Sequence, residues 1–274
     1  EDGTPQFIDF ENQELFEQIN SIPEDFAYLT VGHWMQGELG EDRKNIGLTI
    51  KSFYESFKNR KTTPALILKC CVVNGSILDK SEILRRIKII RDGMIGARIL
   101  PKIYLLHGKF TDSEMNEIYN HPKIKSMISL TKGEGFGRPL LEFCLVNKPI
   151  IATKWSGHVD FLKEENIGYI GGKLEKVHHS AVVKDMILPE SEWFRPNLDD
   201  VNYLLNHVHD EYENWVEKAK KQGDYIRKEF SFESMKKQIK TIFTKNITPL
   251  PKKIDLNIGK IEMPKKTKTK LKKV

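Results

Sequence analysis

Short apolar runs alternate with amphipathic stretches along most of the chain. The runs are bounded by polar or glycine-containing segments, a pattern typical of buried strands. They lie at residues 26–32, 65–73, 103–107, 124–130, 149–153 and 167–170. Six strands separated by helices predict an α/β domain, with one Rossmann-like parallel sheet of about six strands, helices on both faces and right-handed crossovers.

Helical spacing of apolar residues marks the segments between these strands. Ile46, Ile50, Phe53 and Phe57 recur on one face of a helix predicted over 45–57. Further helices are predicted near 81–91, 112–120, 139–146 and 157–162. Residues 171–197 break the alternation and indicate a long connection, and two helices at 198–230 and 232–243 close the domain.

A glycine-rich turn follows the strand at 124–130. It reads Thr131-Lys132-Gly133-Glu134-Gly135-Phe136-Gly137-Arg138-Pro139-Leu140-Leu141-Glu142. Pro139 suits a first helical position because its φ is fixed. The three glycines let the backbone approach a ligand closely, and the free N–H groups at the helix start favour phosphate.

Two carboxylates flank this turn. Glu134 lies within it, and Glu142 lies about one helical turn inside the helix. Their charge would repel phosphate, whereas both can accept hydrogen bonds from hydroxyl groups. A diphosphate with a sugar ring on either side would satisfy the whole arrangement. An isolated Glu in a first turn usually indicates only a solvated helix start, but the glycines, the proline and both acids together favour a binding site.

Two other segments are predicted to reach the same edge of the sheet. Arg43 and Lys44 precede the helix at 45–57, where they could neutralise a diphosphate, although such a pair on its own is more often a solvated helix start. Gly108, Lys109 and Phe110 form a tight turn after the third strand. Phe110 could pack against a nucleotide base, but packing against its own helix would explain an aromatic residue at this position equally well.

The residues Glu134, Gly135, Phe136, Gly137, Pro139 and Glu142 resemble the paired-glutamate motif of retaining glycosyltransferases with the GT-B fold. The resemblance spans roughly residues 27–243, which correspond to the family's C-terminal, donor-binding half. It implies a nucleoside diphosphate sugar as donor, with Glu134 on the transferred sugar and Glu142 on the ribose. The donor-binding residues that it implies also include Gly32, His33, Gly108, Lys109, Phe110, Gly135, Phe136, Gly137, Arg138 and Leu141.

The resemblance also implies the reaction. A hexosyl unit is transferred with retained anomeric configuration, without a cofactor or an obligatory metal, and Glu134, Lys44 and Arg43 are the catalytic candidates. Lys44 matches one of the family's pyrophosphate ligands. His33 stands where an Arg is commonly found, so either Arg43 substitutes for that Arg or phosphate binding is rearranged.

Composition adds few constraints. Cys70, Cys71 and Cys144 are expected to be reduced, buried filler in a cytoplasmic protein. No apolar run approaches the roughly 20 residues that cross a bilayer. The adjacent His178 and His179 have no nearby thiolate and would face opposite sides of a strand, so we expect exposed polar residues and no metal site.

The positive charge is concentrated at the C-terminal end. Residues 252–274 contain nine lysines against Asp255 and Glu262, whereas the whole chain carries +6. Such a segment, with no aromatic residues, cannot bury enough surface to fold. We therefore predict a nucleotide-sugar-binding domain over 1–245 and a disordered basic tail over 246–274. The tail could bind an anionic partner, although a merely solvated tail is the commoner case.

GT-B enzymes pair this domain with an acceptor-binding one. Fewer than about 27 residues precede the first strand, too few for a domain. We therefore expect an N-terminal GT-B domain or a partner chain to complete the enzyme. Two alternatives remain: a noncatalytic nucleotide-sugar-binding module of a larger assembly, and a sugar-nucleotide epimerase of the same fold. The sequence identifies neither the base, nor the sugar, nor the acceptor.

Overall fold

The computed structural model describes residues 6–7, 15–72 and 75–246. The chain divides into two compact units, Glu1–Ser231 and Phe232–Val274. This division falls before the domain boundary at residue 245 that the sequence predicts. The lysine-rich tail at 247–274 lies outside the described residues, so its predicted disorder stays a prediction.

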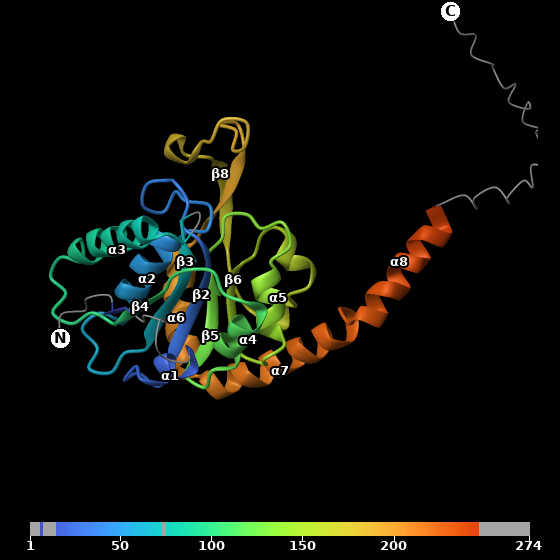
Figure 1. Cartoon of the computed structure of the whole chain (residues 1–274), viewed down its shortest axis with the longest axis horizontal. Helices are drawn as coiled ribbons and strands as arrows, with labels where there is room; N and C mark the ends of the chain where they lie inside the picture. Colours follow the sequence, from blue (N-terminus) through green and yellow to red (C-terminus); the bar gives the residue numbers. More distant parts are fainter. Residues whose placement is uncertain (1–5, 8–14, 73–74, 247–274) are drawn as a thin grey trace, which may run out of the picture. The chain divides into compact units, whose positions relative to one another are not determined.

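A parallel sheet forms the centre of the first unit (Figure 1). Its strands are β1 (Gln6–Phe7), β2 (Ala27–His33), β3 (Ala65–Cys71), β4 (Ile103–Leu106), β5 (Ile124–Ser129), β6 (Ile150–Thr153) and β7 (Gly168–Ile170). The order across the sheet is β1-β4-β3-β2-β5-β6-β7, and all neighbouring pairs are parallel. The six predicted strands are confirmed. The added edge strand β1 is too short to give a periodic signal.

The strand order reverses between β2 and β5. From β2 the chain proceeds outward through β3 to β4, and from β5 it proceeds the other way through β6 to β7. Connections therefore leave the carboxyl ends of β2 and β5 in opposite directions and open a crevice there. In open α/β sheets this is the position where ligands bind.

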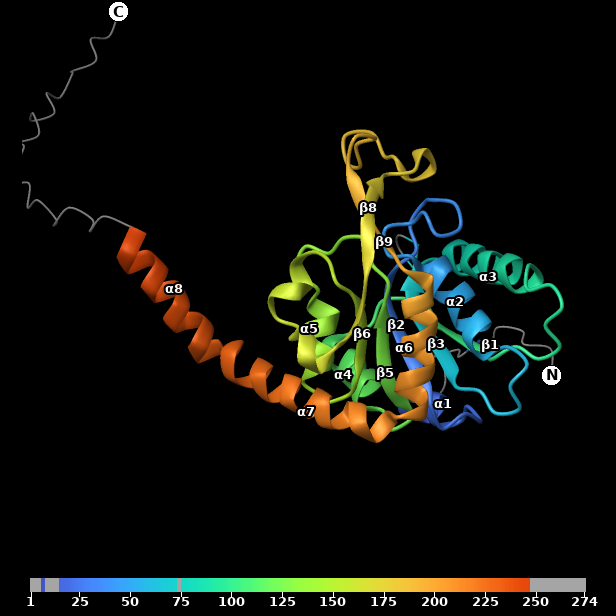
Figure 2. The same ribbon diagram turned by 180° about the vertical axis from the view of Figure 1, so that it is seen from behind.

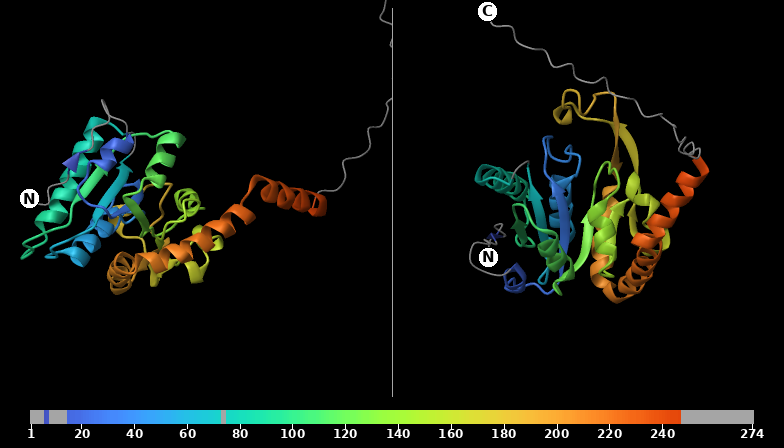
Figure 3. Two further views of the ribbon diagram at one scale, coloured as in Figure 1. Left: turned by 90° about the horizontal axis from the view of Figure 1, so that it is seen from below. Right: turned by 45° about the vertical axis from the view of Figure 1, so that its right-hand side comes forward.

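Helices cover both faces of the sheet (Figures 2 and 3). Two apolar clusters fill the two sides: one contains residues of α2, α3 and α6, the other residues of α1, α4, α5 and α7. The bounds are α1 (Leu15–Asn20), α2 (Ile46–Phe57), α3 (Ile77–Asp92), α4 (Asp112–Asn120), α5 (Arg138–Cys144), α6 (Leu198–Asp210) and α7 (Tyr212–Glu229). This arrangement confirms the predicted fold class.

The single helix predicted over 198–230 is wrong. The chain leaves helical geometry at Glu211, with φ −113° and ψ 37°, between α6 and α7. The indole of Trp215 on α7 donates a hydrogen bond of 2.9 Å to His207 Nδ1 on α6 and so fixes the corner. Neither Gly nor Pro stands at the break, which is why the sequence does not signal it.

The long connection predicted over 171–197 is also wrong. Strands β8 (Gly172–Lys176) and β9 (Glu192–Pro196) pair antiparallel, and Gly172 stands opposite Pro196. This hairpin projects beyond the end of the sheet (Figure 1). Most side chains of β8 are exposed, so the strand lacks the apolar alternation by which strands are recognised in a sequence.

The described residues of the first unit also form three short 3-10 helices: η1 (Gly157–Asp160), η2 (Glu164–Asn166) and η3 (His179–Ala181). Cys70, Cys71 and Cys144 are buried and unpaired, which fits their predicted packing role. In the second unit the described residues form α8 (Phe232–Asn246), as predicted, with no buried side chain. Among the described helices, none has the length and apolar character needed to span a membrane.

The loop that leads into α2 is fixed by a buried acid. Asn45 adopts a left-handed conformation and uses its side chain to donate to Leu130 O, at 2.9 Å, instead of capping the helix. The Asp42 carboxylate accepts a hydrogen bond of 3.1 Å from the backbone N–H of Ile46. Burial raises the pKa of Asp42 to about 6, and its hydrogen bonds to the helix start only partly offset that effect.

Asp42→Asn should become increasingly stable, relative to the wild type, as the pH rises from 4 to 7. Because the pKa of Asp42 is raised in the folded state, its stabilising contribution is complete below the unfolded pKa and is lost as the pH passes about 6. The asparagine does not titrate, so the difference in unfolding free energy should change by about 3 kcal/mol across this window. Urea denaturation at several pH values measures it, and a pH-independent difference would contradict the assignment.

Candidate functional site

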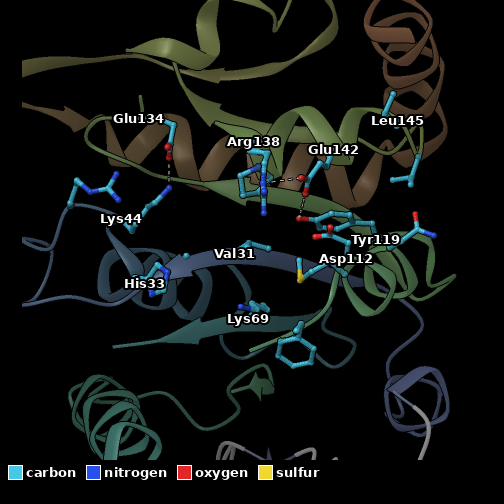
Figure 4. Close-up of a pocket in the computed structure, with 17 residues that line it drawn as sticks. Val31, His33, Lys44, Lys69, Asp112, Tyr119, Glu134, Arg138, Glu142 and Leu145 are labelled. Carbon is cyan, nitrogen blue, oxygen red and sulfur yellow. Dashed lines mark hydrogen bonds and ion pairs between the residues drawn. The ribbon is translucent and has the colours of Figure 1, made fainter. Parts of the chain in front are cut away.

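A cavity of about 620 Å³ opens beyond the carboxyl ends of β2 and β3, beside the glycine turn (Figure 4). Its volume lies within the range of pockets that bury small organic ligands. The wall combines carboxylates, cations and apolar side chains from several elements. The lining residues are Val31, Gly32, His33, Arg43, Lys44, Lys69, Phe110, Asp112, Met115, Asn116, Tyr119, Glu134, Arg138, Pro139, Glu142, Leu145 and Val146.

The glycine turn is clamped by the loop after β6. Ser156 Oγ donates to Glu134 O at 2.6 Å and accepts from the Glu134 N–H at 2.9 Å, and the Gly157 N–H donates to the same carbonyl at 2.9 Å. A Cβ on Gly157 would lie 2.0 Å from Gly135 O, so only glycine allows this approach. Both the N–H and the C=O of Glu134 are therefore held by hydrogen bonds to the loop after β6.

Glu134 forms an ion pair with Lys44, which comes from the loop before α2 (Figure 4). The two side chains are only 16% and 12% exposed, so the pair is largely withdrawn from water. Burial lowers the pKa of Lys44, and the negative charge of Glu134 opposes this shift. The carboxylate thus holds an ammonium group at the cavity wall where it can meet an anion.

Arg43 joins the same loop to the same turn. Its Nη1 donates to Gly133 O at 2.8 Å, and its own carbonyl accepts from the Lys132 N–H at 2.9 Å. These two hydrogen bonds position Lys44 opposite Glu134. Arg43 lines the cavity, so it combines a structural contact with a positive charge near any bound anion.

Glu142 lies farther along the cavity, on α5 (Figure 4). Arg138 Nε lies 3.0 Å from Glu142 Oε1, one turn earlier on the same helix, and the Tyr119 hydroxyl donates to Glu142 Oε2 at 3.2 Å. Burial and the nearby Glu142 charge raise the pKa of Tyr119, so its hydroxyl keeps its proton and remains a donor. A carboxylate has about four acceptor positions, so Glu142 retains capacity for a ligand hydroxyl.

His33 lines the cavity but contributes little positive charge. Desolvation and the nearby charges of Lys69, Lys44 and Arg43 lower the pKa of His33, and its Nδ1 lies 3.2 Å from Cys71 Sγ. A cation missing from the sequence-based prediction lies beside it. Lys69 of β3 reaches the cavity, with its Nζ 5.2 Å from the centroid of the Phe110 ring. The signal for Lys69 was present in the sequence: it is the only charged residue in an otherwise apolar strand.

The structure brings together, as cavity-lining residues, Gly32, His33, Arg43, Lys44, Phe110, Glu134, Arg138 and Glu142. The other predicted site residues lie outside this lining: Gly108, Lys109, Gly135, Phe136, Gly137 and Leu141. Gly137 begins α5 with φ 93°, and a Cβ there would lie 2.9 Å from His158 Cβ. Phe136 packs on Phe161, with 5.3 Å between ring centroids, and Leu141 packs on the core. Gly137 and Phe136 therefore shape the turn and the start of α5 and are not among the lining residues of this cavity.

Residues missed by the sequence prediction complete the wall. They include Tyr119 and Met115 of α4 and Leu145 at the end of α5. An aromatic or apolar residue on an amphipathic helix gives no signal that separates packing from ligand contact. In the described part of the chain, the side chains grouped closely enough to share a metal ion are Glu38, His178 and His179, which do not line this cavity.

No protein-family model matches the chain, and no curated protein matches it. Solved structures do. The C-terminal domain of the glycosyl transferase group 1 family protein LpcC from Francisella tularensis aligns with a TM-score of 0.52 and 14% identity, covering 84% of this chain and 97% of that domain. Anabaena HepE in complex with UDP-glucose aligns with a TM-score of 0.54 and 12% identity, covering 84% and 51%.

Sucrose-phosphate synthase from Thermosynechococcus elongatus aligns with a TM-score of 0.54 and 14% identity, covering 84% of this chain and 48% of the enzyme. The chain therefore spans about half the length of HepE and of this synthase. At such identities the likeness concerns the fold. The chain has the fold of the C-terminal domain of a GT-B glycosyltransferase of group 1.

Gly157→Ala should destabilise the first unit by about 1–3 kcal/mol, because the added Cβ meets the Gly135 carbonyl and neither backbone segment can yield freely. The matched control is Gly133→Ala, since a Cβ on Gly133 would have no heavy atom within 4 Å. Thermal and urea denaturation of both variants measure the effect. Equal stability of the two variants would show that the loop after β6 does not clamp the turn.

Proposed function

We propose that the chain is the donor-binding half of a retaining glycosyltransferase that transfers a hexosyl unit from a nucleoside diphosphate sugar to an acceptor. The observation that carries the proposal is the distribution of charge in one cavity. Glu134 and Glu142 lie apart along its wall, and Arg43, Lys44, Lys69 and Arg138 supply four cations in the same space. A ligand with hydroxyl groups toward both ends and an anionic centre complements such a wall.

In this proposal each residue has a distinct role. Lys44, with Arg43 and Lys69, binds the diphosphate and stabilises the charge that develops on it as the sugar leaves. Glu134 accepts hydrogen bonds from the transferred sugar, and Glu142 accepts them from the ribose. Lys69 supplies the positive charge that His33 does not. Phe110, whose ring centroid lies 5.2 Å from Lys69 Nζ, is the candidate for packing against the base.

The leaving diphosphate needs compensation for its charge, and the cations of this wall can supply it without a metal. We therefore infer metal-independent chemistry, in which electrostatic stabilisation comes from preorganised side chains. HepE binds UDP-glucose, which makes uridine diphosphate sugars the first donors to test.

The acceptor side of the reaction requires a second component. The chain spans about half of HepE and of the synthase, so we infer that an N-terminal GT-B domain or a partner chain supplies the acceptor site. The buried, unpaired cysteines support a cytoplasmic setting for this reaction.

Glu142→Ala should weaken donor binding by roughly tenfold to a hundredfold, which corresponds to losing a hydrogen bond to a charged group. Calorimetry in metal-free buffer, with uridine, guanosine and adenosine diphosphate sugars, measures the effect and identifies the donor class. Glu117→Ala is the matched control, because Glu117 is an exposed acid on α4 that does not line the cavity. Circular dichroism of both variants checks folding. Unchanged affinity in Glu142→Ala for every donor would refute the assignment.

Product analysis separates the reaction classes. The wild-type chain, supplied with donor and with the missing half, should release nucleoside diphosphate and a sugar-acceptor product. Conversion of the sugar nucleotide without an acceptor would indicate an epimerase. Binding without turnover would indicate a noncatalytic module.

A further inference from the structure

Three side chains that commonly bind metals meet away from the donor cavity. Glu38 lies in the loop between β2 and α2, and His178 and His179 lie between β8 and β9. One ligand atom from each lies within 4.8 Å of the others. The loop after β2 and the tip of the hairpin lie side by side in Figures 1 and 2. Residues far apart in the sequence thus form one small cluster at the surface.

Local geometry explains why the two histidines act together. In a strand, adjacent side chains point to opposite faces, which is why the sequence predicts no metal site here. The structure instead places His178 at the N-cap of η3, where the chain turns. The two imidazole rings lie side by side with 4.1 Å between centroids. Because the chain turns here, the two imidazoles lie on the same side of the backbone and can approach one ion together.

The two segments are already held together without a metal. Gln36 Nε2 donates to Val182 O at 2.7 Å, and the Glu38 N–H donates to Ser180 Oγ at 3.0 Å. These hydrogen bonds fix Glu38 beside the histidines. A preformed cluster costs less conformational entropy on metal binding than one assembled from mobile segments.

A second contact orients one imidazole. His178 Nδ1 lies 2.8 Å from Ser180 Oγ. The Ser180 backbone N–H donates to this Nδ1 at 3.3 Å, so the neutral ring carries its proton on Nε2. Binding of a metal at Nε2 requires this proton to move to Nδ1, where it can donate to the Ser180 hydroxyl. Histidines that bind metals usually donate their other ring N–H in this way, because the contact fixes the tautomer and the ring orientation.

We propose that Glu38, His178 and His179 bind a divalent transition metal, with zinc as the best match. Two imidazoles and one carboxylate form a common zinc ligand set, and a tetrahedral ion would keep one position for water. Magnesium and calcium prefer oxygen ligands, so they should bind poorly. The ion would join the β8–β9 hairpin to the loop that continues into Arg43 and Lys44. The proposal is independent of the transfer reaction and gives the ion no part in it.

Calorimetric titration of the metal-free full chain with Zn²⁺ tests the proposal. We expect one ion per chain, a loss in affinity of about 100-fold in the double variant His178→Ala/His179→Ala, and a loss of about tenfold in Glu38→Gln. Co²⁺ should give the visible absorption of a tetrahedral site in the wild type and not in the double variant. Glu190→Gln, an exposed acid in the same connection, is the control and should bind like the wild type.

Three results would overturn the proposal. The first is the absence of saturable Zn²⁺ binding in the wild type. The second is equal affinity in the wild type and the double variant, which would place the ion at other histidines. The third is full affinity in Glu38→Gln, which would remove the loop from the site. Circular dichroism of the variants, whose substituted side chains lie at the surface or half-buried, shows whether each is folded.

Discussion

The ion pair between Lys44 and Glu134 connects the two loops on which the cavity depends. Lys44 belongs to the connection that leaves β2, and Glu134 belongs to the turn that leaves β5, so the pair bridges the crevice where the strand order reverses. Both side chains are largely buried. A lone charge left at this position would be poorly solvated, which makes each partner dependent on the other. The hydrogen bond from Arg43 to the Gly133 carbonyl supports the same bridge.

The same pairing balances the charges of the cavity wall. Glu134 neutralises Lys44, and Arg138 together with Tyr119 satisfies Glu142. Each carboxylate therefore already has a donor that a bound molecule could replace or supplement. In the proposed function, a diphosphate would compete with Glu134 for Lys44, and the released carboxylate would then accept hydrogen bonds from the sugar. Binding of the anion and binding of the sugar would be coupled through a single pair of side chains.

Much of this architecture could be predicted from local patterns. The six strands follow from continuous apolar runs, and the glycine turn follows from its three glycines, of which Gly137 has a positive φ and a crowded Cβ position. What escaped prediction depends on tertiary contacts. The hairpin β8–β9 exposes most of its first strand, and the corner at Glu211 is fixed by a contact between Trp215 and His207. Lys69 was visible as a charge in an apolar strand. The approach of Glu38 to His178 and His179 depends on two loops that no periodicity places together.

The most direct test of the central claim is a crystal structure of the chain with a bound nucleoside diphosphate sugar. We expect Lys44 Nζ within hydrogen-bond distance of a phosphate oxygen, Glu134 released from Lys44 and facing a sugar hydroxyl, and Glu142 facing the ribose. A donor bound elsewhere, or bound in the cavity with the Lys44–Glu134 pair intact and its phosphates directed away from both residues, would contradict the account.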